Sequence, residues 1–429
     1  MAKPNLALIP ATIGDKVYSI LPSDGVGDFD FDRADGSSPT GVTRINAQGL
    51  IEEVASGENR LNYSLLDGEV VGCPHLLLEP QRTNLIQYSE DFSNAAWSKS
   101  NSSITSNSVI SPDGTQNADK LIPNATSSVN KYIYTIPTTS NGIDYTLTVF
   151  AKEGEYDMLR LEDGNNSQGA WFDLSNGTLG TVGASVTAKI QNYGNGWYRC
   201  SVTKPSVSTS VFFVISASNT ESIQVGDGTS GVYIYGAMLE QGSYPTSYIK
   251  TDGSQNTRAA ETCDGSGNAA TFNDSEGVLM AEISALADDI TNRIISLSNG
   301  TNNNIISVQF SNVQSNDIIA YYNATGQTGR VISTTSYNIK SFNKTALVWN
   351  NSSFKFYVNG YLIGSATIET PLVDGTLNQL KFQYGNSTLP FYGNTKQIQY
   401  FDTTDIDLEQ LTSWDSFRAM AEGQLYTIE

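Results

Sequence analysis

The chain has 429 residues, which is too long for one hydrophobic core and predicts two or three domains. It carries 24 Lys and Arg against 44 Asp and Glu, a net charge of −20, so we expect neither nucleic-acid binding nor membrane insertion. Gly and Tyr are abundant, at 37 and 22 residues, which favours short strands and turns over helices.

Residues 1–85 contain strand signals but little continuous apolar sequence. Residues 28–33 alternate polar and apolar side chains, as a half-exposed strand does, and residues 43–54 predict a hairpin that turns at Gln48-Gly49. We therefore expect a β-rich N-terminal docking segment whose apolar face is covered by the next domain or by another subunit.

Residues 86–250 show the most complete sandwich pattern, and its spacing of strands and turns predicts a jelly roll. Asn-Gly and Asp-Gly pairs separate the expected strands, because these pairs tolerate the positive φ of tight turns. The expected strands are 131–136, 144–151, 158–162, 170–174, 185–192, 197–203, 211–217 and 232–239. Residues 251–272 are polar and Gly-rich, which predicts a linker.

Residues 273–429 predict a second sandwich, with a hairpin turning at Asn359-Gly360. The chain then predicts a helix over residues 404–421, capped by Thr404 or Asp405. The expected fold class is all-β: two β-sandwich domains of jelly-roll type in tandem, a β-rich N-terminal docking segment and a C-terminal helix.

The cysteines Cys73, Cys200 and Cys263 lie far apart and form no Cys-x-x-Cys pair. We therefore expect buried free thiols rather than disulfides or a zinc site. No early segment is apolar for the length of a signal peptide, and no later window has the length of a membrane span. Synthesis in the cytoplasm without a signal peptide is the expectation.

Catalytic and metal signals are weak. His75, the only histidine, lies in an apolar run and is expected to be structural. Glu155 and Asp157 resemble part of a glycosidase acid strand, but Arg160 stands where a third acid is needed, so solvated carboxylates are expected. The Asp-x-Asp-x-Asp run at 28–32 lacks the glycine and the bidentate acid of a calcium loop. We expect no enzyme activity, no metal site and no cofactor. Ca²⁺ binding by an acidic loop is the alternative, but no specific motif supports it.

Sugar recognition is the chemistry that the composition permits, because aromatic faces stack on pyranose rings while amide and acid groups bind hydroxyls. For each candidate residue, the alternative to sugar binding is an ordinary structural role in the core or on the strand surface. The candidate residues are Trp97, Tyr156, Trp171, Tyr193, Asn165, Asn166, Gln168, Tyr321 and Tyr322. Trp197 and Trp349 lie within apolar strands and are expected in the core.

Two sequence blocks carry a resemblance to a known class of proteins. Residues 77–85, Leu-Leu-Glu-Pro-Gln-Arg-Thr-Asn-Leu, and residues 231–250 resemble the opening and closing segments of a β-sandwich module in bacteriophage structural proteins. Residues 195–202 resemble a strand of carbohydrate-binding jelly rolls, and residues 344–364 resemble the concanavalin-like, laminin-G-like sandwich.

The resemblance implies a phage virion protein, exposed on the tail or capsid and contacting other virion proteins. A tail fibre or spike that binds host cell-surface glycans without cleaving them is the leading hypothesis, and related fibres imply a homotrimer. A capsid or neck decoration or head-fibre protein with a purely structural role is the alternative. A polysaccharide depolymerase is a third hypothesis. Likeness of fold does not by itself fix function.

Overall fold

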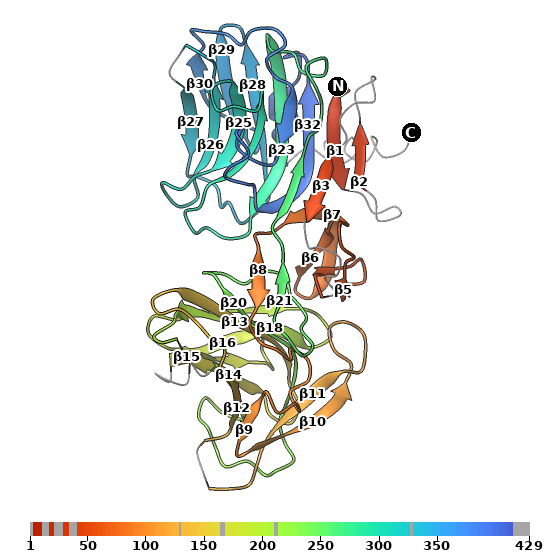
Figure 1. Cartoon of the computed structure of the whole chain (residues 1–429), viewed down its shortest axis with the longest axis vertical. Coiled ribbons are helices and arrows are strands. Elements are labelled where there is room, and N and C mark those ends of the chain that lie inside the picture. Colours follow the sequence, from red (N-terminus) through yellow and green to blue (C-terminus); the bar gives the residue numbers. More distant parts are fainter. Residues whose placement is uncertain are drawn as a thin grey trace.

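The computed structural model describes residues 3–10, 17–20, 29–33, 41–127, 130–163, 168–209, 213–326 and 329–414. Within them, every regular element is a strand apart from one short helix, which confirms the expected all-β class. Two sandwiches lie one above the other along the long axis (Figure 1). Between them lie the strands β5 (Ile51–Glu53), β6 (Leu61–Leu66), β7 (Glu69–Leu78), β8 (Arg82–Asn84) and β21 (Asn256–Arg258). Among the described residues, no helix has the length and apolar character needed to span a bilayer.

The middle of the chain forms a sandwich of two six-stranded sheets with the orders β10-β11-β20-β13-β18-β17 and β16-β15-β14-β19-β12-β9. The first sheet comprises β10 (Ser102–Val109), β11 (Ala118–Pro123), β13 (Asp144–Lys152), β17 (Thr187–Asn192), β18 (Trp197–Pro205) and β20 (Val232–Gln241). The second comprises β9 (Ser98–Ser100), β12 (Tyr132–Thr135), β14 (Met158–Asp163), β15 (Gln168–Asp173), β16 (Thr178–Val182) and β19 (Phe213–Ser218). The pattern of eight strands missed β9, β10, β11 and β16.

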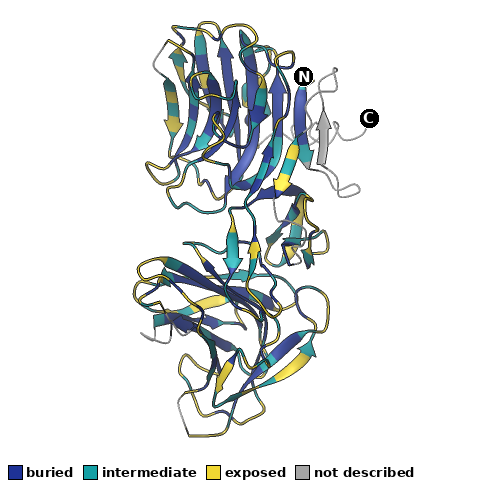
Figure 2. Cartoon of the chain, in the orientation of Figure 1, coloured by how far each residue is buried: buried dark blue, intermediate teal, exposed yellow. Residues whose placement is uncertain are grey.

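Side chains of the first sheet alternate between two apolar clusters. On β13, Leu147 and Val149 enter the core between the two sheets, whereas Phe150 lies on the outer face with Trp197 and Tyr248. Buried residues therefore occupy both faces of this sheet. Exposed residues gather on the loops and on edge strands such as β10 and β16 (Figure 2). A sheet covered on both faces explains why β13 and β20 read as near-continuous apolar runs.

The C-terminal sandwich pairs a nine-stranded sheet with a five-stranded sheet. The larger sheet has the path β2-β1-β32-β23-β28-β29-β30, with β6 and β7 attached at β32; the smaller has the order β27-β26-β25-β24-β31. The bounds are β23 Glu276–Ala285, β24 Arg293–Ser298, β25 Ile305–Phe310, β26 Ile318–Asn323, β27 Arg330–Thr334, β28 Asn343–Asn350, β29 Ser353–Val358, β30 Tyr361–Thr367, β31 Gln379–Lys381 and β32 Gly393–Phe401. Trp349 packs in its core, as Trp197 does in the outer cluster of the jelly roll, and both core assignments are confirmed.

The N-terminal segment completes the C-terminal sandwich of its own chain. Its strands are β1 (Leu6–Pro10), β2 (Val17–Ile20), β3 (Asp30–Arg33), β4 (Thr43–Ile45), β5 (Ile51–Glu53), β6 (Leu61–Leu66), β7 (Glu69–Leu78) and β8 (Arg82–Asn84). β1 pairs antiparallel with β32, with Leu6 opposite Tyr400, and Leu76 of β7 lies opposite Thr395 of the same strand. Leu6, Leu8 and Leu76 thereby enter the core of the C-terminal sandwich.

The stretch from 251 to 272 is ordered by pairing with the N-terminal segment. β21 (Asn256–Arg258) pairs with β8, and β22 (Glu261–Asp264) pairs with β3. Arg258, Glu261 and Cys263 in these strands are all buried. The residues predicted as a linker therefore form part of the junction between the sandwiches.

The predicted turns and helix are present with local differences. β4 and β5 form the hairpin around Gln48-Gly49, and Asn359 and Gly360 turn β29 into β30 with φ of 51° and 89°. The helix α1 is short, Leu408–Thr412, and its N-cap is Asp407 rather than Thr404 or Asp405, because the Asp407 side chain accepts the backbone N–H three residues on. Residues 415–421 lie outside the described residues.

The cysteine expectation needs one correction. Cys200 and Cys263 are buried free thiols as expected, but Cys73 is exposed. Cys73 lies on β7 where the strand leaves its pairing with β6 between Asn62 and Ser64, so its side chain is not covered by the ladder.

The two blocks that carry the resemblance hydrogen-bond to each other. Asn84, fully buried, donates through Nδ2 to the carbonyl oxygens of Ala237 and Ile249 at 3.2 and 2.7 Å. Its Oδ1 accepts the backbone N–H of Leu239 at 3.1 Å. A buried amide that satisfies three backbone groups fixes the opening segment onto the closing strand, which gives the Thr-Asn-Leu sequence a structural reason.

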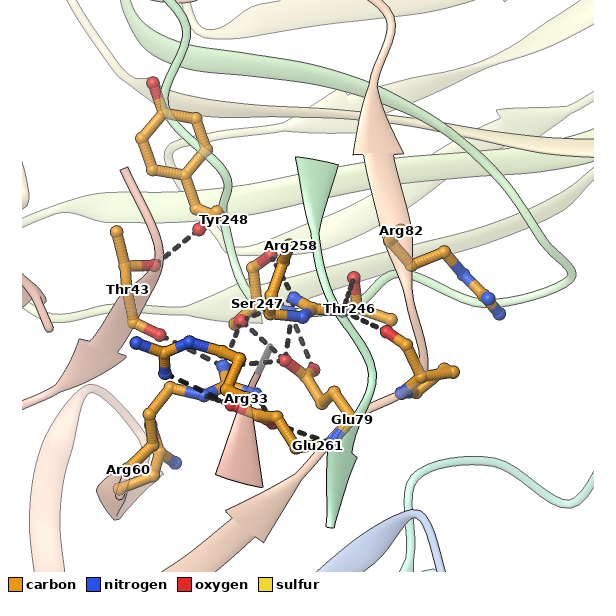
Figure 3. Close-up of polar contacts among 12 residues, drawn as sticks. Arg33, Thr43, Arg60, Glu79, Arg82, Thr246, Ser247, Tyr248, Arg258 and Glu261 are labelled. Carbon is orange, nitrogen blue, oxygen red and sulfur yellow. Dashed lines mark hydrogen bonds and ion pairs between the residues drawn. The ribbon is translucent and has the colours of Figure 1, made fainter. Parts of the chain in front are cut away.

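A buried cluster of charged side chains joins the parts of the chain (Figure 3). Arg60 lies at its centre: Nε donates to Glu261 Oε1 at 2.7 Å, and Nη1 lies 2.7 Å from Glu79 Oε2. Arg258 reaches the same Glu79 oxygen at 2.9 Å, and Arg33 lies 3.4 Å from Glu261. We call these five side chains the junction cluster.

The closing segment completes the junction cluster with hydrogen bonds. Ser247 donates its backbone N–H and its Oγ to the two carboxylate oxygens of Glu79, at 2.8 and 2.6 Å. Burial opposes ionisation of Glu79, but the attraction of Arg258 and Arg60 outweighs it and lowers the pKa of Glu79 to about 2. Burial likewise opposes the charge of Arg60, yet its carboxylate partners raise its pKa above the usual value.

Candidate functional site

Two of the predicted sugar-binding residues are core residues. Trp97 is 2% exposed, and its Nε1 donates to the Tyr88 carbonyl oxygen at 2.8 Å. Tyr322 is 1% exposed in the C-terminal sandwich, and its hydroxyl accepts the Leu372 N–H at 3.2 Å. Neither ring face is available to a sugar in this conformation.

The other predicted residues lie apart from one another. Trp171 is buried on β15 beneath the Arg160 guanidinium, and Gln168 is half-buried at the start of the same strand. Tyr156 is half-buried against the jelly-roll core, and Tyr193 packs edge-on against Phe150 on the outer face of the other sheet. Tyr321 is half-buried on β26 of the second sandwich. Asn165 and Asn166 lie outside the described residues, and a sugar-binding role for the nine residues stays a prediction.

The structure shows a polar cleft at another place on the jelly roll. It lies between the segment that follows β8, the β10–β11 hairpin and residues 250–252, and its volume is about 440 Å³. We call it the acidic cleft, because four carboxylates and one lysine line it. The lining residues are Tyr88, Glu90, Asp91, Ser93, Ser106, Asn107, Asn117, Asp119, Lys250, Thr251 and Asp252.

Asp119 forms the inner wall of the acidic cleft. It is 2% exposed on β11, and its two oxygens accept the backbone N–H groups of Asn107 and Phe92 at 3.0 and 3.1 Å. Burial raises the pKa of Asp119 to about 6, which the two backbone hydrogen bonds only partly offset. Asp119 therefore carries a charge at neutral pH and has lone pairs left to accept hydroxyl groups.

A hydrogen-bonded group of side chains fixes the other wall. Glu90 Oε1 accepts the hydroxyls of Tyr235 and Tyr248 at 2.9 and 3.1 Å, and its Oε2 lies 3.2 Å from Lys250 Nζ. The Tyr248 hydroxyl also lies 2.6 Å from Ser89 Oγ. Because these groups hold one another, the wall is preorganised before any ligand arrives.

Two buried polar atoms in the acidic cleft lack a protein partner. Asn117 Oδ1 and Thr251 Oγ1 find no hydrogen-bond partner in the part of the chain that the structure describes. Thr251 is 4% exposed, so its hydroxyl is held away from bulk water. A buried polar group without a partner costs about 1–3 kcal/mol, and a rotation of either side chain toward a ligand hydroxyl or amide in the cleft would offset that cost.

The cleft chemistry suits a neutral polyhydroxylated ligand. Carboxylate, amide and hydroxyl groups converge on one volume, and the half-exposed Tyr88 ring borders it. Four carboxylates repel an anion, and the described residues contain no cluster of three His, Cys, Asp or Glu side chains that could hold a metal ion. His75 lies elsewhere, buried on β7, and burial lowers its pKa to about 3, so it is uncharged at neutral pH.

Sequence reasoning missed the cleft residues because most of them lie in loops, and the others lie on β10 and β11, which show no regular apolar alternation. The one signal available was Asp113-Gly114-Thr115, which the sequence indicates as a turn. Asp113 closes the β10–β11 hairpin by accepting hydrogen bonds from Ser111 and Thr115, and its Oδ2 accepts Asn117 Nδ2 at 2.9 Å. That turn places Asn117 and the residues after it on the cleft.

Comparison with known proteins identifies one domain. Residues 280–405 match the Concanavalin A-like lectin/glucanases superfamily, so the second sandwich is similar in fold to concanavalin A-like, laminin-G-like domains. No curated protein matches the chain significantly. The match of residues 280–405 confirms the expected concanavalin-like fold of the second sandwich.

Similar solved structures include Ruminococcus gnavus IT-sialidase CBM40 bound to α2,3-sialyllactose, at 18% identity and TM-score 0.30, covering 35% of this chain and 94% of that one. The heptameric SAP-like pentraxin of Limulus polyphemus has 14% identity and TM-score 0.27, covering 33% and 72%. Mouse laminin α1 domains LG4-5 have 12% identity and TM-score 0.25, covering 68% and 90%. At these values the likeness carries no argument about function.

Proposed function

We propose that this protein binds glycans non-covalently in the acidic cleft of its jelly roll, as a tail-fibre or spike component of a bacteriophage virion. The observation that carries the glycan-binding part is a cleft of about 440 Å³ lined by carboxylate, amide and hydroxyl side chains, two of which, Asn117 and Thr251, carry a buried polar atom without a protein partner in the described part of the chain. The ligand is a neutral sugar, because the surrounding carboxylates disfavour a negative charge.

Each wall of the cleft has a task in this proposal. Tyr88 offers a ring face to the apolar side of a pyranose, and Asp119 and Asn117 bind the hydroxyl groups at the ring edge. Thr251 also lines the cleft, and its hydroxyl is able both to donate and to accept a hydrogen bond. The match of residues 280–405 to a superfamily named for lectins and glucanases supports carbohydrate as the ligand class for the protein as a whole.

The virion setting is supported by the two sequence blocks, 77–85 and 231–250, that resemble phage structural modules. In this setting the protein contacts other virion proteins and presents its sandwiches outward to the host surface. We propose a homotrimer as its assembly. Light scattering coupled to size-exclusion chromatography tests the trimer, and antibody labelling of purified virions tests the location.

Glycan binding is tested by replacing the unpartnered hydroxyl. Thr251→Val keeps the shape and removes a buried hydroxyl that no described residue binds, so the melting temperature stays unchanged or rises. Binding to the best ligand on a glycan array weakens about fivefold to tenfold, the value of one hydrogen bond. Thr178→Val, at an exposed position on β16, is the matched control and binds as wild type does. Equal binding by Thr251→Val and wild type contradicts the proposed site.

The depolymerase hypothesis has one observation in its favour. Burial opposes the ionisation of Asp91, but hydrogen bonds from Ser93 and Asn94 outweigh it and lower the pKa of Asp91. Burial raises the pKa of Asp119. Catalytic acid and base pairs show this kind of contrast. Against it, Asp91 Oδ1 accepts three hydrogen bonds within its own turn, and both Asp119 oxygens hold backbone N–H groups. Reducing-end release from host polysaccharide, abolished by Asp119→Asn, would establish cleavage; our proposal expects no release.

A further inference from the structure

A second cavity lies at the junction, on the other side of Tyr248 from the acidic cleft. Its volume is about 220 Å³, and it is bordered by the outer face of the jelly-roll sheet, by the N-terminal segment and by Asn394 of the C-terminal sandwich. Thr43, Arg44 and Ile45 line it on one side, where Thr43 Oγ1 donates to the Tyr248 carbonyl oxygen at 2.6 Å (Figure 3). All three parts of the chain therefore build its walls.

Arg199 is the charged side chain on the sheet wall of this cavity. It lies on β18 between Phe150 and Gln191 of the two neighbouring strands, and it is 8% exposed. Its guanidinium lies over the Phe150 ring at 5.5 Å and, among the described residues, makes one hydrogen bond, in which Nη2 donates to Thr148 Oγ1 at 3.3 Å. Nε of Arg199 has no hydrogen-bond partner in the described residues.

No carboxylate of the described residues forms a direct ion pair with Arg199, although burial raises the pKa of Glu240 and the positive charge of Arg199 partly offsets that rise. The acids of the neighbourhood are engaged elsewhere: Glu79 is held by the junction cluster, and Glu240 accepts the Thr246 N–H and Oγ1 at 2.8 and 2.6 Å. Glu240 also lies 3.5 Å from Arg82. Keeping a buried guanidinium without a counter-ion is costly, and a bound anion would offset the cost.

Arg44 and Arg199 outnumber the one carboxylate, Glu79, among the side chains that line this cavity, on a chain whose net charge is −20. Lys189 lies on the strand beside it, two residues before Gln191 and therefore on the same face. Partial desolvation and the like charges of Arg199 and Lys340 lower the pKa of Lys189. An anion entering here meets the opposite environment from that of the acidic cleft.

We propose that this cavity binds the carboxylate of an acidic sugar, such as a uronic acid, on Arg199. The planar guanidinium presents Nε and Nη in the fork that matches a carboxylate. Gln191, Asn62 and Asn394 supply amides for the sugar hydroxyls, and the half-buried Tyr193 ring supplies a stacking face. The inference extends the proposed glycan binding to a second ligand class and a second site.

The test titrates the full chain with glucuronate and with glucose by isothermal calorimetry, with inorganic sulfate as a third probe. Glucuronate binds, glucose does not bind at this cavity, and Arg199→Met weakens glucuronate binding about tenfold to a hundredfold, the value of a charged bidentate contact. Arg199→Lys keeps the charge without the fork and gives an intermediate loss. Arg160→Met, which removes another arginine of the jelly roll, is the matched control.

The outcomes separate this proposal from the acidic-cleft proposal. Thr251→Val leaves glucuronate binding unchanged, whereas Arg199→Met leaves binding of the neutral array ligand unchanged. Equal glucuronate binding by wild type and Arg199→Met overturns the proposal, as does sulfate binding as tight as glucuronate binding, which indicates a general anion site. If Arg199→Met fails to fold, as circular dichroism would show, the comparison with Arg199→Lys decides.

Discussion

Glu79 shows how neighbouring side chains keep a buried carboxylate charged. Buried alone, it would be neutral, but two guanidinium groups and Ser247 keep it ionised. Removing one member of such a group leaves an uncompensated buried charge, which is why the junction cluster acts as a unit.

Stability at acid pH reports on Glu79. Its pKa is about 2 in the folded protein against an ordinary value of 4.5, so its contribution is fully present above pH 4.5 and is lost as pH falls toward 2. We expect the difference in unfolding free energy between wild type and Glu79→Gln to reach about 3 kcal/mol above pH 4.5 and to shrink toward pH 2. Chemical denaturation across pH 2–6 measures it, with exposed Glu409→Gln as control. A difference that does not change with pH would refute the assignment.

The residue scale also shows what sequence reading could not supply. The core positions of Trp197 and Trp349 follow from their apolar strands, and the structural reading of His75 agrees with its burial. Arg199 and Thr251 gave no sequence signal, because an unpartnered polar atom exists only once the neighbouring strands are placed.

At the scale of elements, apolar alternation found most strands of the jelly roll and missed β10, which is largely exposed, and β11, which is buried but has no regular alternation. β10 reads Ser-Ser-Ile-Thr-Ser-Asn-Ser-Val and is largely exposed, and β11 contains Asp, Lys and Pro, so neither shows a sandwich period. These two strands build one wall of the acidic cleft. The polar side chains of β10 and β11 suit the cleft to a glycan, but they also removed the apolar pattern from which these strands could have been predicted.

The turn at Asn359-Gly360 is an element that the sequence does specify. Both residues have positive φ, and Gly360 at 89° is strained for any residue with a Cβ atom. Gly360→Ala is expected to destabilise the C-terminal sandwich by about 1 kcal/mol, read from its thermal unfolding. Ser365→Ala, exposed on β30, should have no effect. An unchanged melting temperature for Gly360→Ala would show that the turn tolerates a side chain.

The strand β1 tests whether the N-terminal segment belongs to the C-terminal sandwich. Leu8 is 1% exposed and lies opposite Ile398 of β32. Leu8→Ala should cost about 2–5 kcal/mol, the range for deleting a buried leucine side chain. Leu66→Ala, at a position 63% exposed, is the control and should cost little. If both variants unfold alike in denaturant, β1 does not dock as described.

At the scale of the whole molecule, the chain closes on itself. β1, β3 and β7 pair with strands close to or within the C-terminal sandwich, so the two halves are joined both by the peptide chain and by the junction cluster. The two-sandwich architecture follows from turn spacing. The pairing of the first strand with β32 does not, because nothing local in either sequence specifies a partner so distant.

Cooperative unfolding tests that closure. We expect one calorimetric transition for wild type, because Arg60 binds Glu79 of the opening segment and Glu261 before the second sandwich. Arg60→Met leaves two buried carboxylates short of a partner and is expected to cost about 3–5 kcal/mol and to separate the transition into two. Arg160→Met, whose side chain is 23% exposed, should keep a single transition near the wild-type temperature. Two transitions in wild type would mean that the sandwiches are independent.

The most direct measurement is a crystal structure of the full chain with the neutral oligosaccharide that binds best on a glycan array. We predict the sugar between Tyr88 and Asp119, with a hydroxyl on Thr251 Oγ1 or Asn117 Oδ1. A sugar bound on another surface, with these two atoms still unpaired, would contradict the assignment of the acidic cleft.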